Sequence, residues 1–133
     1  MADETEAPPQ AAIGTIAWRD LTVDDAEGVG AFYSKVLGWR MEPLDMDGYS
    51  DYMMIPEGAS GAEAGVCHRR GQNADMPPQW IMYVMVADIE AAVAECLRNG
   101  GKTVTDIRAA GEDGIFCVIQ DPAGAVLGLY QNK

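Results

Sequence analysis

The amino-acid sequence predicts an α+β fold made of two βαβββ modules that curve into an eight-stranded cup, with one helix outside each module. The first observation behind this prediction is a repeat, because the segment from Trp18 to Trp39 is similar to the segment from Ile81 to Lys102. Matching residues keep a constant offset, as Asp25 and Asp88 show (88 − 25 = 63). The second observation is that the hydrophobic period changes from strand-like to helix-like within each copy. Since neither copy buries its apolar face alone, we expect the two to share one core.

The first module begins with a strand from Thr15 to Val23, in which side chains alternate between two faces. A helix follows, for which Asp24 is the predicted N-cap, with Glu27 completing a capping-box-like pair. Gly38 provides the stop signal at the end of this helix. Three short strands bounded by turn-forming residues complete the module, at Met41 to Leu44, Tyr49 to Ile55 and Gly65 to His68.

The second module repeats this order after a segment rich in turn formers, residues 69–79. A strand from Trp80 to Val86 precedes a helix that Asp88 caps and that the pair Gly100-Gly101 ends. Three further strands are predicted at Lys102 to Thr105, Gly114 to Gln120 and Ala125 to Gln131. The predicted organisation is therefore one domain over residues 13–131, made of modules 13–68 and 80–131 joined by linker 69–79, after a disordered tail at residues 1–12.

Composition limits the partners and the compartment. The 133 residues carry 9 basic and 21 acidic side chains, a net charge of −12 that repels phosphate backbones, so nucleic-acid binding is not expected. The acidic, proline-bearing N-terminus lacks the features of a signal peptide or a membrane anchor, so no membrane partner is expected. Three cysteines, an odd number without a Cys-x-x-Cys pair, predict reduced thiols and a cytoplasmic location.

Several phrases of the sequence resemble the vicinal oxygen chelate superfamily, which includes glyoxalase I, bleomycin-resistance proteins and extradiol dioxygenases. They are the helix phrase Ala31 to Trp39, Asp25 before it, and Asp121-Pro122-Ala123-Gly124 near the C-terminus. The opening Trp18-Arg19-Asp20-Leu21 is most similar to that of a glyoxalase-like group. The resemblance implies the cup-shaped fold, a small-molecule ligand in the cup and a homodimer.

The resemblance also bears on a metal. Metalloenzymes of the superfamily place His or Glu at positions that correspond here to Trp18, Ile81 and Gly128, with a fourth near Gly65 or Cys67. The three well-registered residues offer no oxygen, imidazole or thiolate donor, so we expect neither a metal nor another cofactor. His68, the only histidine, stands beside two arginines at a predicted strand end and is expected to face water.

Asp20 is the main candidate for a functional side chain. Strand alternation places it on the same face as Trp18 and Thr22, and the repeat offset makes Tyr83 its counterpart. A buried carboxylate is either paired or functional, so Asp20 either makes a structural hydrogen bond to Tyr83 or to a backbone amide, or is a ligand-binding group. The predicted ligand-binding set is Trp18, Asp20, Thr22, Tyr52, Ile81, Tyr83, Met85 and Gly128.

Three functions remain open from the sequence. The first is a metal-independent binding protein that sequesters a cationic or aromatic compound, as bleomycin-resistance members of the superfamily do. The second is a glyoxalase-like lyase, isomerase or hydrolase with Asp20 as the catalytic general base, or a metal-dependent dioxygenase or glyoxalase with atypical ligands. The third is a subunit whose cup is filled by its own side chains.

Overall fold

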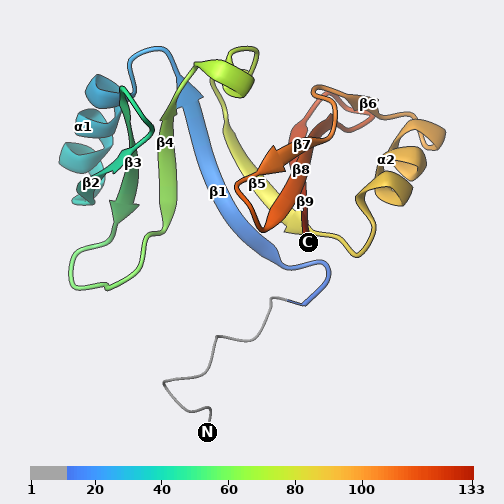
Figure 1. The fold of residues 1–133 in the computed structure, drawn as a ribbon, viewed down its shortest axis with the longest axis horizontal. Coiled ribbons are helices and arrows are strands. Elements are labelled where there is room, and N and C mark those ends of the chain that lie inside the picture. The colour runs from blue at the N-terminus through green and yellow to red at the C-terminus, as the bar shows by residue number, and fades with distance from the viewer. Residues whose placement is uncertain (1–11) are drawn as a thin grey trace, which may run out of the picture.

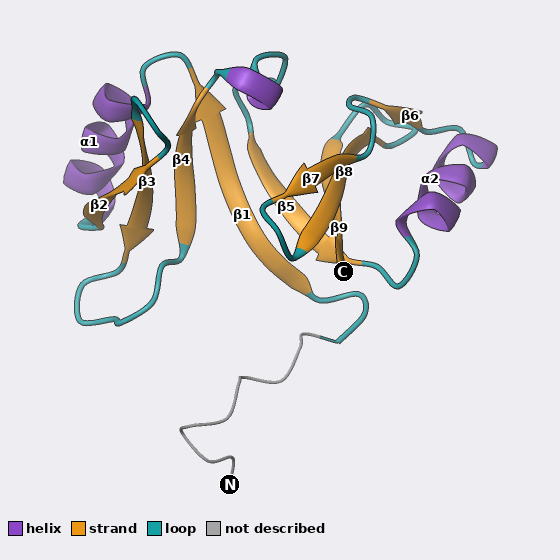
Figure 2. Ribbon diagram, in the orientation of Figure 1, coloured by secondary structure: helices purple, strands orange, loops and turns teal. Residues whose placement is uncertain are grey.

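The computed structural model describes residues 12–133, which form one curved nine-stranded sheet and two α-helices (Figures 1 and 2). In chain order the elements are β1 (Ile16–Val23), α1 (Ala26–Leu37), β2 (Arg40–Asp45), β3 (Ser50–Ile55), β4 (Ala64–His68), the 3-10 helix η1 (Gly71–Asn73), β5 (Trp80–Met85), α2 (Ile89–Arg98), β6 (Lys102–Thr103), β7 (Arg108–Ala110), β8 (Gly114–Gln120) and β9 (Val126–Asn132). The tail predicted at residues 1–12 lies outside the described residues, except for Ala12.

The order of the strands is β2-β3-β4-β1-β5-β9-β8-β6, and β7 pairs with β8. β1 and β5 meet at the centre as antiparallel neighbours, with Trp18 opposite Tyr83. Each of them also has a parallel neighbour, β4 beside β1 and β9 beside β5. This repeated arrangement confirms the predicted α+β cup. The sheet has nine strands rather than eight because the segment after α2 forms two short strands, β6 and β7, in place of one.

The N-terminal ends of both helices are fixed by capping side chains. Asp88 caps α2 as predicted, because its Oδ1 accepts a hydrogen bond from the Ala91 amide at 3.2 Å. The predicted N-cap of α1 is wrong by one residue, since Asp25 accepts the bond from the Gly28 amide at 2.9 Å. Asp24 instead forms an ion pair with Arg69 at 3.0 Å.

The helices cover one face of the sheet, and they lie toward its two ends (Figure 1). Between α1 and the sheet the buried cluster is Ala26, Met54 and Val66, and between α2 and the sheet it is Ile89, Cys117 and Leu129. A third cluster, Met76, Ile81, Tyr83, Phe116 and Val118, lies near the centre. Since α1 and α2 close the outer face, the inner face of the sheet is left to form a site. No helix among residues 12–133 is long and apolar enough to cross a membrane.

Candidate functional site

A cavity of about 600 Å³ opens on the inner face of the sheet, within the size range of small-molecule sites. Its walls come from both halves of the molecule, and most of its lining side chains are apolar or aromatic. The largest are Trp18, Met53, Met76, Tyr83, Met85, Phe116 and Tyr130. The cup is therefore not filled by its own side chains.

Five of the eight residues predicted to bind ligand line this cavity, namely Trp18, Asp20, Thr22, Tyr83 and Met85. They share the inner face because side chains alternate between the two faces along β1 and β5, and residues paired across these antiparallel strands point to the same face.

The other three predicted residues lie outside the lining. Ile81 is only 1% exposed and packs in the central core cluster. Gly128 stands opposite Tyr83 in the β5 and β9 pairing. Tyr52 faces α1, because its strand neighbour Met53 faces the cavity.

Asp20 lies at the centre of the inner face, opposite Ile81 on β5 and Gly65 on β4. Its Oδ1 is buried and has no hydrogen-bond partner among residues 12–133. Burial raises the pKa of this carboxyl to about 7; the neighbouring Tyr83 hydroxyl and Trp18 indole lower the pKa, while the charge of Asp51 raises it. Although both polar groups are close enough to act on the pKa, neither forms a hydrogen bond to Oδ1. At neutral pH the carboxyl is thus divided between its charged and neutral forms.

A second buried carboxylate, that of Asp51, lies near both Asp20 and Cys67. Asp51 is 5% exposed, and its Oδ1 accepts a hydrogen bond from the His68 amide at 2.8 Å. Burial and the charges of Asp20 and Asp51 raise the pKa of the Cys67 thiol far above its usual range. Cys67 therefore stays a neutral thiol at neutral pH, which excludes a thiolate nucleophile at this position.

His68 does not face water as predicted. Its side chain is 20% exposed, and its Nδ1 lies 3.5 Å from Oδ1 of Asp51. The imidazole also packs edge-on against Tyr49, with ring centroids 5.7 Å apart. The prediction was wrong because β4 brings the end of the first module against β3, so that a strand-end residue is partly covered.

The residues at the positions of a superfamily metal do not form a metal site. The repeat offset identifies the fourth position as Gly65 (128 − 63 = 65), so that two of the four positions have no side chain. A Cβ atom on Gly128 would lie 2.9 Å from Cγ of Tyr83, which leaves no room for a longer ligand such as Glu unless the ring moves. Among residues 12–133 no group of three or more His, Cys, Asp or Glu side chains is placed to hold an ion. The donor set does not fit a divalent metal.

Two segments that the sequence did not single out complete the cavity. Residues 69–79, predicted only as a linker, contribute Gln72, Asn73 and Met76, and β7 contributes Ala109 and Ala110. Irregular segments have no hydrophobic period, so the only signal was the apolar Met76 in a segment that is otherwise mostly polar.

Asp20 is the only charged side chain among the described residues that line the cavity. Arg108 lies nearby on β7, but Asp75 and Asp106 already neutralise its guanidinium. A ligand therefore meets a single acidic group in an apolar surface. This chemistry favours a cation or a neutral hydrogen-bonding group over an anion.

Comparisons with known proteins agree with this fold. A family model described as a glyoxalase-like domain matches residues 20–129. The chain belongs to this glyoxalase-like family. It is 30% identical over 119 residues to the protein named "Putative glyoxylase CFP32" of Mycobacterium bovis, and the match covers 89% of this chain and 46% of that protein. The same values hold for the protein of that name from Mycobacterium tuberculosis. The chain thus spans about half the length of these curated relatives.

Solved structures show the same fold at low sequence identity. A hypothetical protein from Bacillus halodurans has a TM-score of 0.59 at 12% identity, covering 90% of this chain and 95% of its own. A glyoxalase/bleomycin resistance protein/dioxygenase superfamily member from Vibrio splendidus has a TM-score of 0.54 at 15% identity, covering 86% and 96%. Methylmalonyl-CoA epimerase from Mycobacterium tuberculosis has a TM-score of 0.53 at 15% identity, covering 93% of each chain. At these identities the likeness concerns the fold alone.

Proposed function

We propose that this protein binds a small, largely apolar molecule in the cup without a metal, and that Asp20 holds a cationic or hydrogen-bond-donating group of that molecule. The observation that carries the proposal is the buried Oδ1 of Asp20, which has no partner among the described residues. An unpartnered buried carboxylate is costly, and a ligand donor that reaches it regains that free energy on binding.

The rest of the lining supports an aromatic or apolar ligand body. Trp18 and Tyr83 offer ring faces beside Asp20, which suits a cation held between a carboxylate and aromatic rings. Met53, Met76 and Met85 offer flexible side chains that adapt to an irregular ligand. A solved neighbour is named methylmalonyl-CoA epimerase, but the lining residues described here include no basic side chain for an anionic thioester. An anionic thioester would therefore find no positive charge partner among these lining residues.

Three matched compounds test the proposal by calorimetry, namely 2-phenylethylammonium, the neutral 2-phenylethanol and the anionic 3-phenylpropanoate. We expect the cation to bind best and its affinity to rise with pH through about 7, because only ionised Asp20 attracts it. Asp20→Asn removes the charge and is expected to weaken the cation by about 1.5–3 kcal/mol, roughly 10- to 150-fold. Equal affinities for all three compounds, unchanged in Asp20→Asn, would contradict the proposal.

The pKa of Asp20 also favours a second candidate, a lyase or isomerase in which this carboxylate removes a proton from the bound substrate. A general base works best with a pKa close to the working pH, and Asp20 has a pKa of about 7. Turnover would then rise with the ionised fraction of Asp20. The two candidates differ in Asp20→Asn, which would stop turnover in the enzyme while a neutral ligand still binds.

We infer that the protein acts as a homodimer, because β2 is an exposed sheet edge and α1 keeps apolar side chains in solvent. Phe32 and Val36 lie one turn apart on α1 and are 57% and 60% exposed. A second copy covering this surface would remove it from water. Light scattering tests this inference, since a concentration-independent mass of 14.3 kDa contradicts it.

A further inference from the structure

The outer wall of the cavity is made by two segments that belong to different halves of the chain. Residues 69–79, called the strap here, run from the end of β4 to the start of β5. The strap places Gln72, Asn73 and Met76 on the cavity, and β7 places Ala109 and Ala110 on it. The position of this wall thus depends on the contact between the strap and β7.

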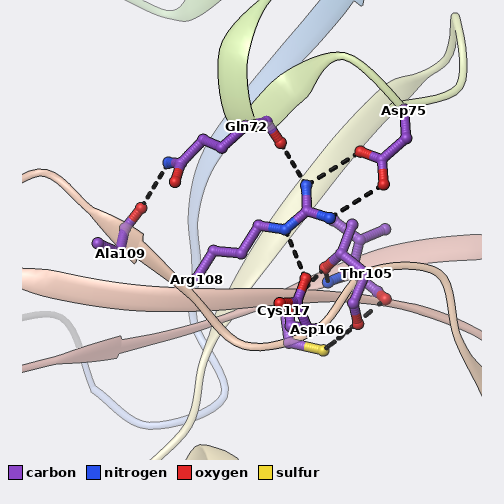
Figure 3. A network of polar contacts seen from close by, with 8 residues as sticks. Gln72, Asp75, Thr105, Asp106, Arg108, Ala109 and Cys117 are labelled. Carbon is purple, nitrogen blue, oxygen red and sulfur yellow. Dashed lines mark hydrogen bonds and ion pairs between the residues drawn. The ribbon is translucent and has the colours of Figure 1, made fainter.

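One guanidinium joins these two segments (Figure 3). Nη1 and Nη2 of Arg108 donate to Oδ1 and Oδ2 of Asp75 on the strap at 3.0 and 2.9 Å. Nη1 also donates to the carbonyl of Gln72, and Nε donates to Oδ1 of Asp106 at 2.7 Å. In return, Nε2 of Gln72 donates to the carbonyl of Ala109 at 2.8 Å. The two-pronged Arg–carboxylate contact is among the stronger polar contacts, and it fixes direction as well as distance.

The backbone gives this contact little help. η1 has only three residues, and its amide bonds from Asn73 and Ala74 remain inside the strap. β7 also has three residues and pairs with β8. Among the described residues, no backbone hydrogen bond connects the strap to β7. The side chains of Arg108 and Gln72, with the packing of Met76, therefore hold this wall.

We propose that Arg108 is a positioning residue of the ligand cavity, which fastens the strap to β7 and so keeps water away from Asp20. Arg108 is suited to this role because its side chain is 16% exposed and its hydrogen bonds go to the strap and to Asp106. The biological meaning of this wall rests on the proposed function, but the wall itself is tested without a ligand.

Arg108→Met tests the proposal, and Arg19→Met is the matched control. Arg19 also pairs with a carboxylate, Glu63 at 2.7 Å, and donates to a backbone carbonyl, but it does not line or brace the cavity. We expect amide hydrogen exchange at residues 71–76 and 108–110 to become roughly tenfold faster in Arg108→Met and to stay unchanged in Arg19→Met.

A second readout reports on water inside the cavity. The groups that act on the Asp20 carboxyl are Asp51, Cys67, Tyr83 and Trp18, and none of them is altered by Arg108→Met. Loss of a positive charge alone would raise the pKa of Asp20, whereas entry of water lowers it from about 7 toward the ordinary value of 3.8. Carbon-13 NMR titration of the carboxyl is therefore expected to show a fall. A role of Arg108 in general stability would leave the pKa of Asp20 in the folded protein unchanged.

Two further variants keep the test decisive if Arg108→Met does not fold. Asp75→Asn changes a side chain that is 57% exposed and weakens the two-pronged contact, while Arg108→Lys keeps the charge without the fork. Both are expected to shift exchange and the pKa of Asp20 in the same direction by smaller amounts. Wild-type exchange in the strap, or a wild-type pKa of Asp20, in the folded variants overturns the proposal. Failure of the proposed function would appear instead as absent ligand discrimination with the strap still slow to exchange.

Discussion

Asp20→Asn is expected to make the protein more stable than the wild type at pH 8, although it alters a buried residue of the central sheet. The carboxyl has a pKa of about 7 when folded, against an ordinary value of 3.8. Between these two values the folded state holds a proton that the unfolded state has released. Stability from Asp20 is thus fully present below pH 3.8, is lost as the pH rises to about 7, and stays lost above it.

The magnitude follows from the width of this window. Each pKa unit corresponds to about 1.36 kcal/mol, so ionised Asp20 lowers the free energy of unfolding by at most about 4 kcal/mol at pH 8. Between pH 5 and pH 8 the wild type crosses about two of these units and loses about 3 kcal/mol. The neutral amide of Asn leaves a buried polar group without a partner, which costs about 1–3 kcal/mol at every pH. The variant is therefore expected to gain about 1–3 kcal/mol at pH 8 and nothing at pH 5.

Urea denaturation at the two pH values measures this difference, with the midpoints and slopes fitted separately. Glu112→Gln is the control, because Glu112 is exposed in the turn between β7 and β8. This substitution removes the same charge as Asp20→Asn, but from a solvent-exposed position. An equal loss of stability at pH 5 and pH 8 in Asp20→Asn would refute the reasoning. That outcome would identify Asp20 as a structural hydrogen-bond partner of Tyr83.

The residues around Asp20 also determine the metal content, the packing and the thiol reactivity of the central sheet. Elemental analysis of the purified protein is expected to find no stoichiometric zinc, nickel, iron or manganese, and one ion per chain that His68→Ala releases would contradict the donor argument. Gly128→Ala is expected to lower the free energy of unfolding by about 1–3 kcal/mol, since its Cβ overlaps the Tyr83 ring, and the loss caused by Gly128→Ala should be smaller when it is measured in a Tyr83→Ala background. Cys67 is expected to react with iodoacetamide at pH 8 far more slowly than a free cysteine, because its pKa is raised; mass spectrometry of the labelled peptide measures this, and a fast reaction would contradict the prediction.

The fold was largely predictable because the repeat constrained both halves at once. Strand alternation, helix caps and turn residues each agreed with the constant offset, and the family match over residues 20–129 confirms the assignment. The errors of the fold prediction lie where two neighbouring residues are both suitable as the helix N-cap, or where a strand is very short. Asp24 and Asp25 are both good caps, and only the position of the Gly28 amide decides between them. β7 has three residues, too few for a period.

The candidate site was predictable only on its central strands. On β1 and β5 the repeat places Asp20 and Tyr83 on the same face of the sheet. The other residues of these two strands on that face could therefore be named from strand alternation. On β3 both Tyr52 and Met53 are suitable lining residues, and the sequence does not tell which one turns inward. The sequence could not predict that the strap lines the cavity. Its position depends on the contact between Asp75 and Arg108, which are more than 30 residues apart in the chain.

The repeat is symmetric in fold but not in chemistry, and this difference would orient a ligand that binds as proposed. Asp20 in the first half and Tyr83 in the second occupy equivalent places, yet one is acidic and the other is a neutral phenol whose pKa burial raises further. A metal at this centre would need donors from both halves, whereas the second half offers rings and aliphatic side chains such as Phe116 and Met85. A molecule bound as proposed would therefore have its charged partner on the β1 side and mainly aromatic and thioether side chains on the β5 side. This polarity predicts that Asp20→Asn changes the charge preference of the cavity, while Phe116→Ala weakens all ligands alike through lost apolar contact.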